Sequence, residues 1–140
     1  GDWLEVSGYQ RYRISKTAVE LPKRHLHRPL GGIFSSKLMA GRSVLDVGAN
    51  LGEFSVLSLY QGAAKVTALE MDAQNFMALK RVQERTKTDD FIVLNQKLSD
   101  HEGMYDIVMA WAVIHWLCGY SEGDGKLESP IVKLASLTSD

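Results

Sequence analysis

Four short apolar runs recur in the second part of the chain, separated by longer segments of mixed polarity. They comprise residues 43–47, 65–70, 91–96 and 105–111, and they are rich in β-branched and other apolar residues, which is typical of strands. The first, second and fourth runs lack a polar residue at every second position. That pattern is typical of strands buried on both faces of a sheet.

The segments between and after these runs have the features of helices. Helices are predicted over residues 52–62, 73–86, 112–119 and 127–138. In the second of these, Asp72 can cap the first turn, and Phe76, Leu79 and Val82 fall on one face. Strands that alternate with helices predict an α/β fold, a Rossmann-like, doubly wound and mostly parallel sheet with helices on both faces.

The length and composition are those of one ordinary globular domain. The chain has 140 residues, of which 45% are hydrophobic and 24% charged. Its longest nearly apolar run, Ile107 to Cys118, has 12 residues and is shorter than the ~20 residues of a membrane span. Cys118 is the single cysteine, so neither an internal disulfide nor a CxxC zinc pair can form. We therefore expect a reducing, cytoplasmic location and no membrane partner.

Charge is distributed unevenly between two parts of the chain. Residues 1–42 carry eight Lys and Arg against three Asp and Glu, a net charge of +5, whereas residues 43–140 carry eight against fourteen, a net charge of −6. We therefore predict a basic N-terminal arm or helical layer over 1–42 and a compact acidic domain over 43–140. His25 and His27 could hold a metal ion, but no other histidine or cysteine cluster supports this. We therefore interpret His25 and His27 as solvated basic residues that bind no metal.

The segment "DVGANLG" lies where the first predicted strand gives way to a helix. In a doubly wound sheet, ligands bind at the carboxyl ends of the strands. Gly48 and Gly52 would allow a tight turn and a close approach to a ligand, and free N–H groups at the start of the 52–62 helix would form an anion or acceptor site. Asp46 could hold the loop through backbone N–H groups or face a cationic ligand through water. Glu70 ends the second strand 24 residues later, where a carboxylate can accept both hydroxyls of a ribose.

A nicotinamide-dependent dehydrogenase is the nearest competing interpretation of this loop. Such enzymes need the pattern GxGxxG, in which a third glycine lets the helix pack closely on the strand. This chain has Glu53 at that position, which argues strongly against a dehydrogenase.

The ordered motifs over roughly residues 40–118 resemble those of class I S-adenosylmethionine-dependent methyltransferases. "LDVGANLGEF" is similar to the first motif of that family, with Asn50 in place of the middle glycine, a form typical of the FkbM-like branch. "VTALEMD" is similar to the second motif, whose acidic residue binds the cofactor ribose. "NQKLSDHEG" is similar to an FkbM-like segment that borders the adenine of the cofactor. "YDIVMAWAVIHWL" is similar to the fourth motif of many small-molecule methyltransferases, in which the end of the strand borders the methionine part of the cofactor.

The resemblance implies S-adenosyl-L-methionine as the cofactor and a set of binding residues spread over these motifs. The set is Asp46, Gly48, Ala49, Asn50, Gly52, Phe54, Glu70, Met71, Lys97, Leu98, Ala110 and Trp111. The implied function is methyl transfer to an unidentified acceptor, with a small molecule favoured over nucleic acid. The alternatives are a non-catalytic cofactor-binding remnant and an RNA-binding accessory domain.

Trp111 and His115 are the candidate catalytic residues, because they lie at and just beyond the end of the fourth predicted strand. Trp111 could cover the charged sulfonium through a cation–π contact, or could simply be part of the core. His115 could take a proton from the acceptor, but a partly buried histidine on an amphipathic helix is the interpretation we prefer. Many methyl transfers need only in-line placement of the nucleophile.

The RNA-binding alternative rests on the first sixteen residues, where aromatic and arginine side chains are interleaved. A lid or packing helix with its basic groups in solvent is the interpretation we prefer, because the whole chain is not basic.

The family core has seven strands in the order 3-2-1-4-5-7-6, and this sequence predicts four of them. We therefore expect a partial, C-terminally truncated domain. The strand over 105–111 would then lie at an edge of the sheet, covered either by a second copy of the chain in a homodimer or by the segment 127–138.

Overall fold

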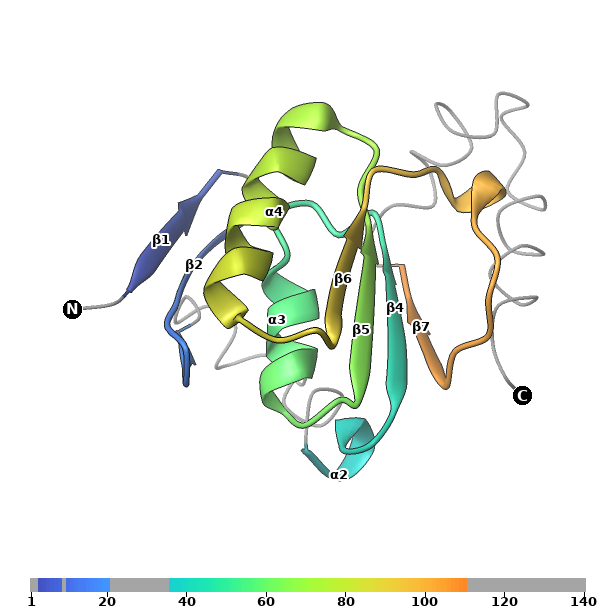
Figure 1. The fold of residues 1–140 in the computed structure, drawn as a ribbon, viewed down its shortest axis with the longest axis horizontal. Helices are drawn as coiled ribbons and strands as arrows, with labels where there is room; N and C mark the ends of the chain where they lie inside the picture. The colour runs from blue at the N-terminus through green and yellow to red at the C-terminus, as the bar shows by residue number, and fades with distance from the viewer. Residues whose placement is uncertain (1–2, 9, 21–35, 111–140) are drawn as a thin grey trace.

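The computed structural model describes residues 3–8, 10–20 and 36–110, and Figure 1 shows how their helices and strands are arranged. In chain order they are β1 (Leu4–Ser7), β2 (Arg11–Ile14), β3 (Val19–Glu20), α2 (Ser36–Met39), β4 (Ser43–Val47), α3 (Glu53–Tyr60), β5 (Lys65–Leu69), α4 (Ala73–Thr86), β6 (Phe91–Leu94), the 3-10 turn η2 (Leu98–Asp100) and β7 (Ile107–Met109). None of the described helices is long and apolar enough to cross a membrane.

The four strands β4 to β7 form one parallel sheet in the spatial order β6-β5-β4-β7. In this sheet Leu45 lies opposite Thr67 on one side and Val108 on the other. The chain winds from β4 outward to β6 and then crosses back to β7, so β4 stands at the point where the winding reverses. The predicted fold class and the expected 3-2-1-4 strand order are confirmed. The last strand, Ile107–Met109, is shorter than the predicted run over 105–111.

Local sequence signals account for the helix α4 in full. Its observed bounds, Ala73–Thr86, are the predicted ones, and the Asp72 side chain accepts a hydrogen bond from the backbone N–H of Asn75 at 2.9 Å. Leu79 and Val82 are fully buried. The cap and the apolar face therefore determine where this helix begins and which side it presents to the sheet.

The helices α3 and α4 both cover the same face of the parallel sheet (Figure 1). The opposite face buries a second hydrophobic cluster, made by Leu45, Val47, Leu69 and Leu98. The helices predicted over 112–119 and 127–138 lie outside the described residues. The expectation of helices on both faces is therefore confirmed for one face by α3 and α4.

The first twenty residues correct one expectation. We expected a basic arm or a helical layer there, but β1, β2 and β3 form an antiparallel sheet. Tyr12 and Ile14 point inward and are buried in the main hydrophobic core, while Arg13 between them pairs outward with Glu5 at 3.7 Å and Glu20 at 2.6 Å. This period of two is the pattern of a strand with one buried face. The division of the chain at residue 42 stays a prediction.

This small sheet packs on the side of α3 and α4 that faces away from the parallel sheet (Figure 1). Val6, Tyr12 and Ile14 belong to the same core cluster as Val44 of β4 and Val56 of α3. The outer sheet therefore buries apolar surface of both helices that would otherwise face water.

The buried hydroxyl of Tyr12 provides a test of how much this outer sheet stabilises the fold. It donates a hydrogen bond of 2.6 Å to the carbonyl oxygen of Leu51. Tyr12→Phe removes the hydroxyl and leaves the carbonyl oxygen of Leu51 without this hydrogen bond. We therefore expect the free energy of unfolding to fall by about 1–3 kcal/mol. Urea denaturation followed by circular dichroism measures the loss. An unchanged midpoint would mean that the bond contributes nothing to stability.

Candidate functional site

The loop from β4 to α3 turns sharply at the carboxyl end of the sheet. Gly48, Asn50 and Gly52 have φ angles of 67°, 59° and 90°, so three of the five residues from 48 to 52 adopt the left-handed region. Asparagine tolerates this region better than most residues other than glycine. This conformation explains why asparagine can replace the middle glycine of the usual motif.

Gly52 is required by protein packing as well as by its backbone angle. A Cβ atom at this position would lie 2.5 Å from Cδ2 of Leu79 and 3.3 Å from the hydroxyl of Tyr12. The side of Gly52 that would carry a Cβ therefore faces α4 and the outer sheet, and the expected approach of a ligand to its backbone stays a prediction. The expected tight turn is confirmed at both glycines by their positive φ angles.

The start of α3 is capped by a side chain from the outer sheet. The Oε1 atom of Gln10, which is buried, accepts hydrogen bonds from the backbone N–H groups of Leu51 at 3.0 Å and Glu53 at 3.1 Å. We expected free N–H groups here for an anion or acceptor. The N–H groups of Leu51 and Glu53 are instead satisfied within the protein, because the Gln10 side chain supplies the acceptor that a helix N-terminus needs.

Glu70 holds the loop from the next strand. Its Oε1 atom accepts from the backbone N–H of Asn50 at 2.7 Å, and its Oε2 atom accepts from the N–H of Asp72 at 2.9 Å. Its own N–H donates to the carbonyl of Leu94 at 3.0 Å, and its carbonyl accepts from the Asn95 amide at 2.9 Å. The carboxylate is therefore fixed in position at the junction of three strand ends.

The electrostatic environment of Glu70 comes mainly from burial. The residue is 7% exposed, and burial raises the pKa of its carboxyl, while the N–H groups of Asp72 and Asn50 oppose the rise. A carboxylate has about four lone-pair positions. The two backbone bonds occupy one on each oxygen, and the Asn75 side chain is a further hydrogen-bond partner. The remaining position can accept a hydrogen bond from a ligand hydroxyl group.

Asp46 is buried and bonds to Ser55 in the first turn of α3. It is 2% exposed, and its Oδ2 atom accepts a hydrogen bond of 2.6 Å from the hydroxyl of Ser55 on α3. It also accepts a hydrogen bond from the backbone N–H of Ser55, which is in α3 and not in the loop where we expected such a donor. The alternative role, facing a cationic ligand through water, stays a prediction. Burial raises the pKa of Asp46 to about 7, with the negative charge of Glu70 raising it further and the Ser55 bond opposing the rise.

The structure brings four of the predicted cofactor residues together at one place. Gly48, Ala49 and Asn50 form the loop beside Glu70, and the N–H of Ala49 donates to the carbonyl of Leu69 at 2.9 Å. The side-chain Oδ1 atom of Asn50 is buried and has no hydrogen-bond partner among the described residues.

The other predicted residues contribute in different ways. Phe54 packs against the main core, and Leu98 is buried in the second hydrophobic cluster, with Ala110 packed against it. Met71 is 43% exposed and Lys97 is exposed, so both are accessible from solvent. Trp111, His115, His25 and His27 lie outside the described residues.

Sequence reasoning missed two groups of residues near this site. Gln10 and Tyr12 both contact the loop. The alternation of arginine with apolar residues in "RYRI" was a signal for β2, which carries Tyr12 and which Gln10 immediately precedes. His101 is also buried, with its two ring nitrogens each 2.7 Å from a polar atom, Oε1 of Gln96 and the hydroxyl of Tyr105. No periodicity in the sequence indicates this second group.

Comparisons with known proteins place this geometry in a known fold. No family model matches the chain. A probable protein arginine N-methyltransferase 6.2 from Oryza sativa subsp. indica is 35% identical over 65 residues, which cover 46% of this chain and 16% of that protein. Among solved structures, a candidate RNA methyltransferase from Pyrococcus horikoshii matches with a TM-score of 0.61 and 23% identity, covering 78% of this chain and 53% of that one. The magnesium protoporphyrin IX methyltransferase of Synechocystis PCC 6803, solved with bound S-adenosylmethionine, matches with a TM-score of 0.59 and 23% identity, covering 72% and 47%.

These matches define the class of fold. The chain has the Rossmann-like fold of class I S-adenosylmethionine-dependent methyltransferases. The chain spans less than a fifth of the curated relative named above and about half of the two solved structures.

The buried carboxyl of Asp46 makes folding stability depend on pH. Because its pKa is raised from 3.8 to about 7, the folded protein holds a proton here that the unfolded chain releases. The resulting stabilisation is complete below about pH 4 and is lost as the pH rises through about 7. We expect wild type to lose unfolding free energy relative to Asp46→Asn between about pH 4 and 7, as measured by urea denaturation. The variant Asp89→Asn, at an exposed position, is the control. Parallel pH curves for wild type and Asp46→Asn would contradict the assignment.

Proposed function

We propose that this chain binds S-adenosylmethionine at the carboxyl ends of β4 and β5 and takes part in transfer of its methyl group to an acceptor. The observation that carries the proposal is the carboxylate of Glu70, fixed by the N–H groups of Asn50 and Asp72. A group held in this way loses little freedom when it accepts hydrogen bonds from a ribose.

The residues present fit such a cofactor. Glu70 keeps an acceptor position for a ligand hydroxyl beside its bonds to Asn50, Asp72 and Asn75. The buried Oδ1 atom of Asn50 is an acceptor with no partner among the described residues, which a ligand donor could satisfy. Exposed Met71 follows Glu70 and can flank the ligand with an adaptable apolar side chain. When bound, the cofactor supplies an electrophilic methyl group on a sulfonium.

The carboxylates at this end of the sheet also suit a cationic ligand. Burial disfavours the ionised forms of Asp46 and Glu70, and each shift is a free-energy cost that a nearby positive charge reduces. A ligand that carries a sulfonium would therefore bind more favourably than a neutral one of the same shape. Positioning of the nucleophile in line with the methyl group then supplies most of the rate acceleration.

The relatives support methyl transfer as the reaction class. Their names indicate acceptors as different as protein arginine, RNA and a magnesium porphyrin, and one was solved with the same cofactor that we propose here. For this chain we propose a small-molecule acceptor, which rests on the resemblance of its fourth motif. The FkbM-like branch, the roles of Trp111 and His115, the homodimer and the cytoplasmic location stay predictions.

Glu70 gives the direct test of cofactor binding. We expect Glu70→Ala to weaken the affinity for S-adenosylhomocysteine at least tenfold, because charge-assisted hydrogen bonds contribute about 1.5–3 kcal/mol. Glu70→Gln, which keeps one acceptor oxygen and the side-chain size, should lose less. Isothermal titration calorimetry measures both affinities.

The control for this test is Glu102→Ala, an exposed glutamate outside the loop. Circular dichroism and the unfolding midpoint of each variant establish that the fold is retained. Wild-type affinity in a folded Glu70→Ala protein would overturn the cofactor site. A methyl-transfer assay over candidate acceptors then separates an enzyme from a protein that only binds the cofactor.

A further inference from the structure

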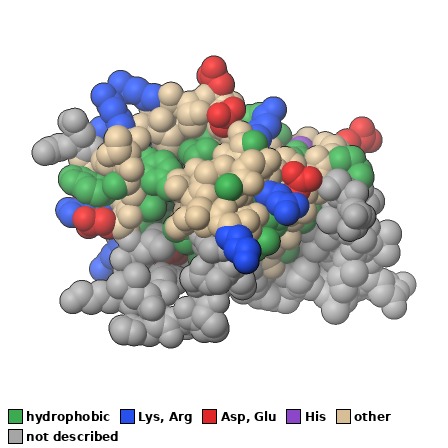
Figure 2. Space-filling view, turned by 90° about the horizontal axis from the view of Figure 1, so that it is seen from below, with side chains coloured by type: hydrophobic (Ala, Val, Ile, Leu, Met, Phe, Trp, Pro, Cys, Tyr) green, Lys and Arg blue, Asp and Glu red, His purple; other side chains and the backbone are tan. Residues whose placement is uncertain are grey.

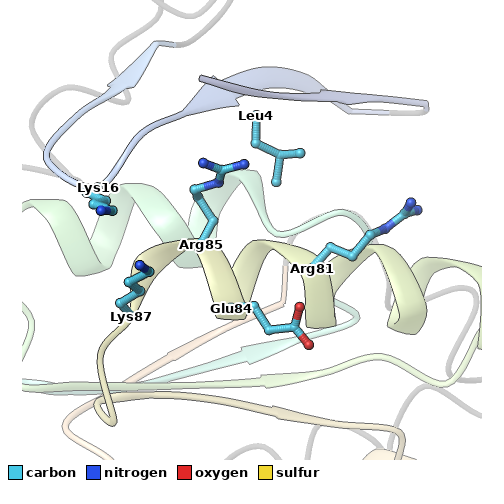
Figure 3. A pocket seen from close by; sticks show the side chains of 6 residues that line it. All are labelled: Leu4, Lys16, Arg81, Glu84, Arg85 and Lys87. Atoms are coloured by element: carbon cyan, nitrogen blue, oxygen red, sulfur yellow. The ribbon is translucent and has the colours of Figure 1, made fainter. Parts of the chain in front are cut away.

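A basic pocket of about 410 Å³ lies between the outer sheet and the last turns of α4. It is open to solvent, and Figure 3 shows how its side chains come from both elements. The lining consists of Leu4 from β1, Lys16 from the turn after β2, Arg81, Glu84 and Arg85 from α4, and Lys87 immediately after that helix.

The charges in this pocket do not balance. Four cationic side chains surround it against the one carboxylate of Glu84. Within the part of the chain that the structure describes, Lys16, Arg81 and Lys87 form no ion pair, and the ion pairs of the outer sheet are made by Arg13 on other residues. Such a group of like charges attracts an anion, which would reduce the repulsion between them.

Helix α4 explains only part of this arrangement. The negative end of the helix dipole favours cations such as Arg85 and Lys87 near its C-terminus. Lys16 comes from a distant part of the sequence and reaches the pocket only because the outer sheet packs on α4. The tertiary structure therefore adds a positive charge beyond those that the helix end favours.

The pocket is separate from the proposed cofactor site. The chain enters α4 at the carboxyl ends of the strands, beside Glu70, and runs along the helix to the opposite, amino end of the sheet (Figure 1). Elsewhere, on the face seen from that end, basic and acidic side chains of the described residues are interspersed (Figure 2).

We propose that this pocket binds the phosphate group of a phosphate ester. The pocket has the size of a small-ligand site, and lysine and arginine are the side chains that bind phosphate oxygens. Glu84 supplies an acceptor for a hydroxyl of the same ligand, which an ester of a sugar carries and a simple anion does not. The phosphate can belong to a free sugar phosphate or nucleotide, or to one unit of an RNA strand. This inference does not depend on the proposed methyl transfer.

The test uses a double variant, Lys16→Gln/Arg81→Gln, in which two exposed side chains of the pocket lose their charge. The matched control is Lys37→Gln/Lys65→Gln, which changes the net charge equally at exposed positions outside the pocket lining. Equal unfolding midpoints of the two variants and wild type establish that the fold is retained. The probes are adenosine monophosphate, measured by calorimetry, and a short single-stranded RNA of mixed sequence, measured by fluorescence anisotropy.

We expect the pocket variant to bind at least one probe tenfold or more weakly than wild type, with the control close to wild type. Weaker binding of adenosine monophosphate by the pocket variant would show that the pocket binds a free phosphate ester. Weaker binding of RNA alone would show that the pocket binds a phosphate within an RNA strand. In the second case the slope of log affinity against log salt should fall by about 1.4, because each phosphate contact to a single strand contributes about 0.7. Absence of binding by wild type to both probes, or equal losses in both variants, would overturn the proposal.

Discussion

The loop between β4 and α3 depends on hydrogen bonds from two side chains that hold its backbone. Glu70 accepts from Asn50, and Gln10 accepts from Leu51 and Glu53. A turn with three left-handed residues is unfavourable for an isolated chain, so it persists only where the surrounding structure over-determines it. These acceptors satisfy three buried or partly buried amides and hold the loop in a geometry suited to a ligand.

The outer sheet has a role beyond that of a cover. Its inward residues complete the core on the far side of α3 and α4, and Gln10 and Tyr12 reach through to the loop. The turn after β2 also carries Lys16 to the end of α4. One small element therefore stabilises the proposed cofactor loop and builds the proposed phosphate pocket, although the two lie toward opposite ends of the parallel sheet (Figure 1).

The buried carboxyl groups show how stability and binding oppose each other at this end of the sheet. Asp46 is buried with Ser55 as its hydrogen-bond partner, and Glu70 with the backbone of Asn50 and Asp72 and the side chain of Asn75. The pKa of each carboxyl is raised by burial. Such groups reduce the stability of the free protein near neutral pH. They are favourable only together with a ligand of positive charge, which is the property that the proposed cofactor has.

The sequence alone determined the strands, the parallel sheet and the bounds of α4, because these depend on neighbouring residues, whereas the strand order came from the resemblance to the methyltransferase family. Apolar runs of strand length, the Asp72 cap and the spacing of Leu79 and Val82 are all local signals. The position of Glu70 beside the glycine loop was also predictable, since parallel strands end at one edge of the sheet.

Tertiary structure alone decided which partners the loop has. The bond from Leu51 to Gln10 joins residues 41 positions apart, and no local pattern states that this glutamine caps that helix. The same holds for Asp46, whose partner is Ser55 of α3, and for Gly52, whose open side faces Leu79. Their partners depend on how separate elements pack, because a buried polar group takes whichever complementary atom the packed core brings within reach.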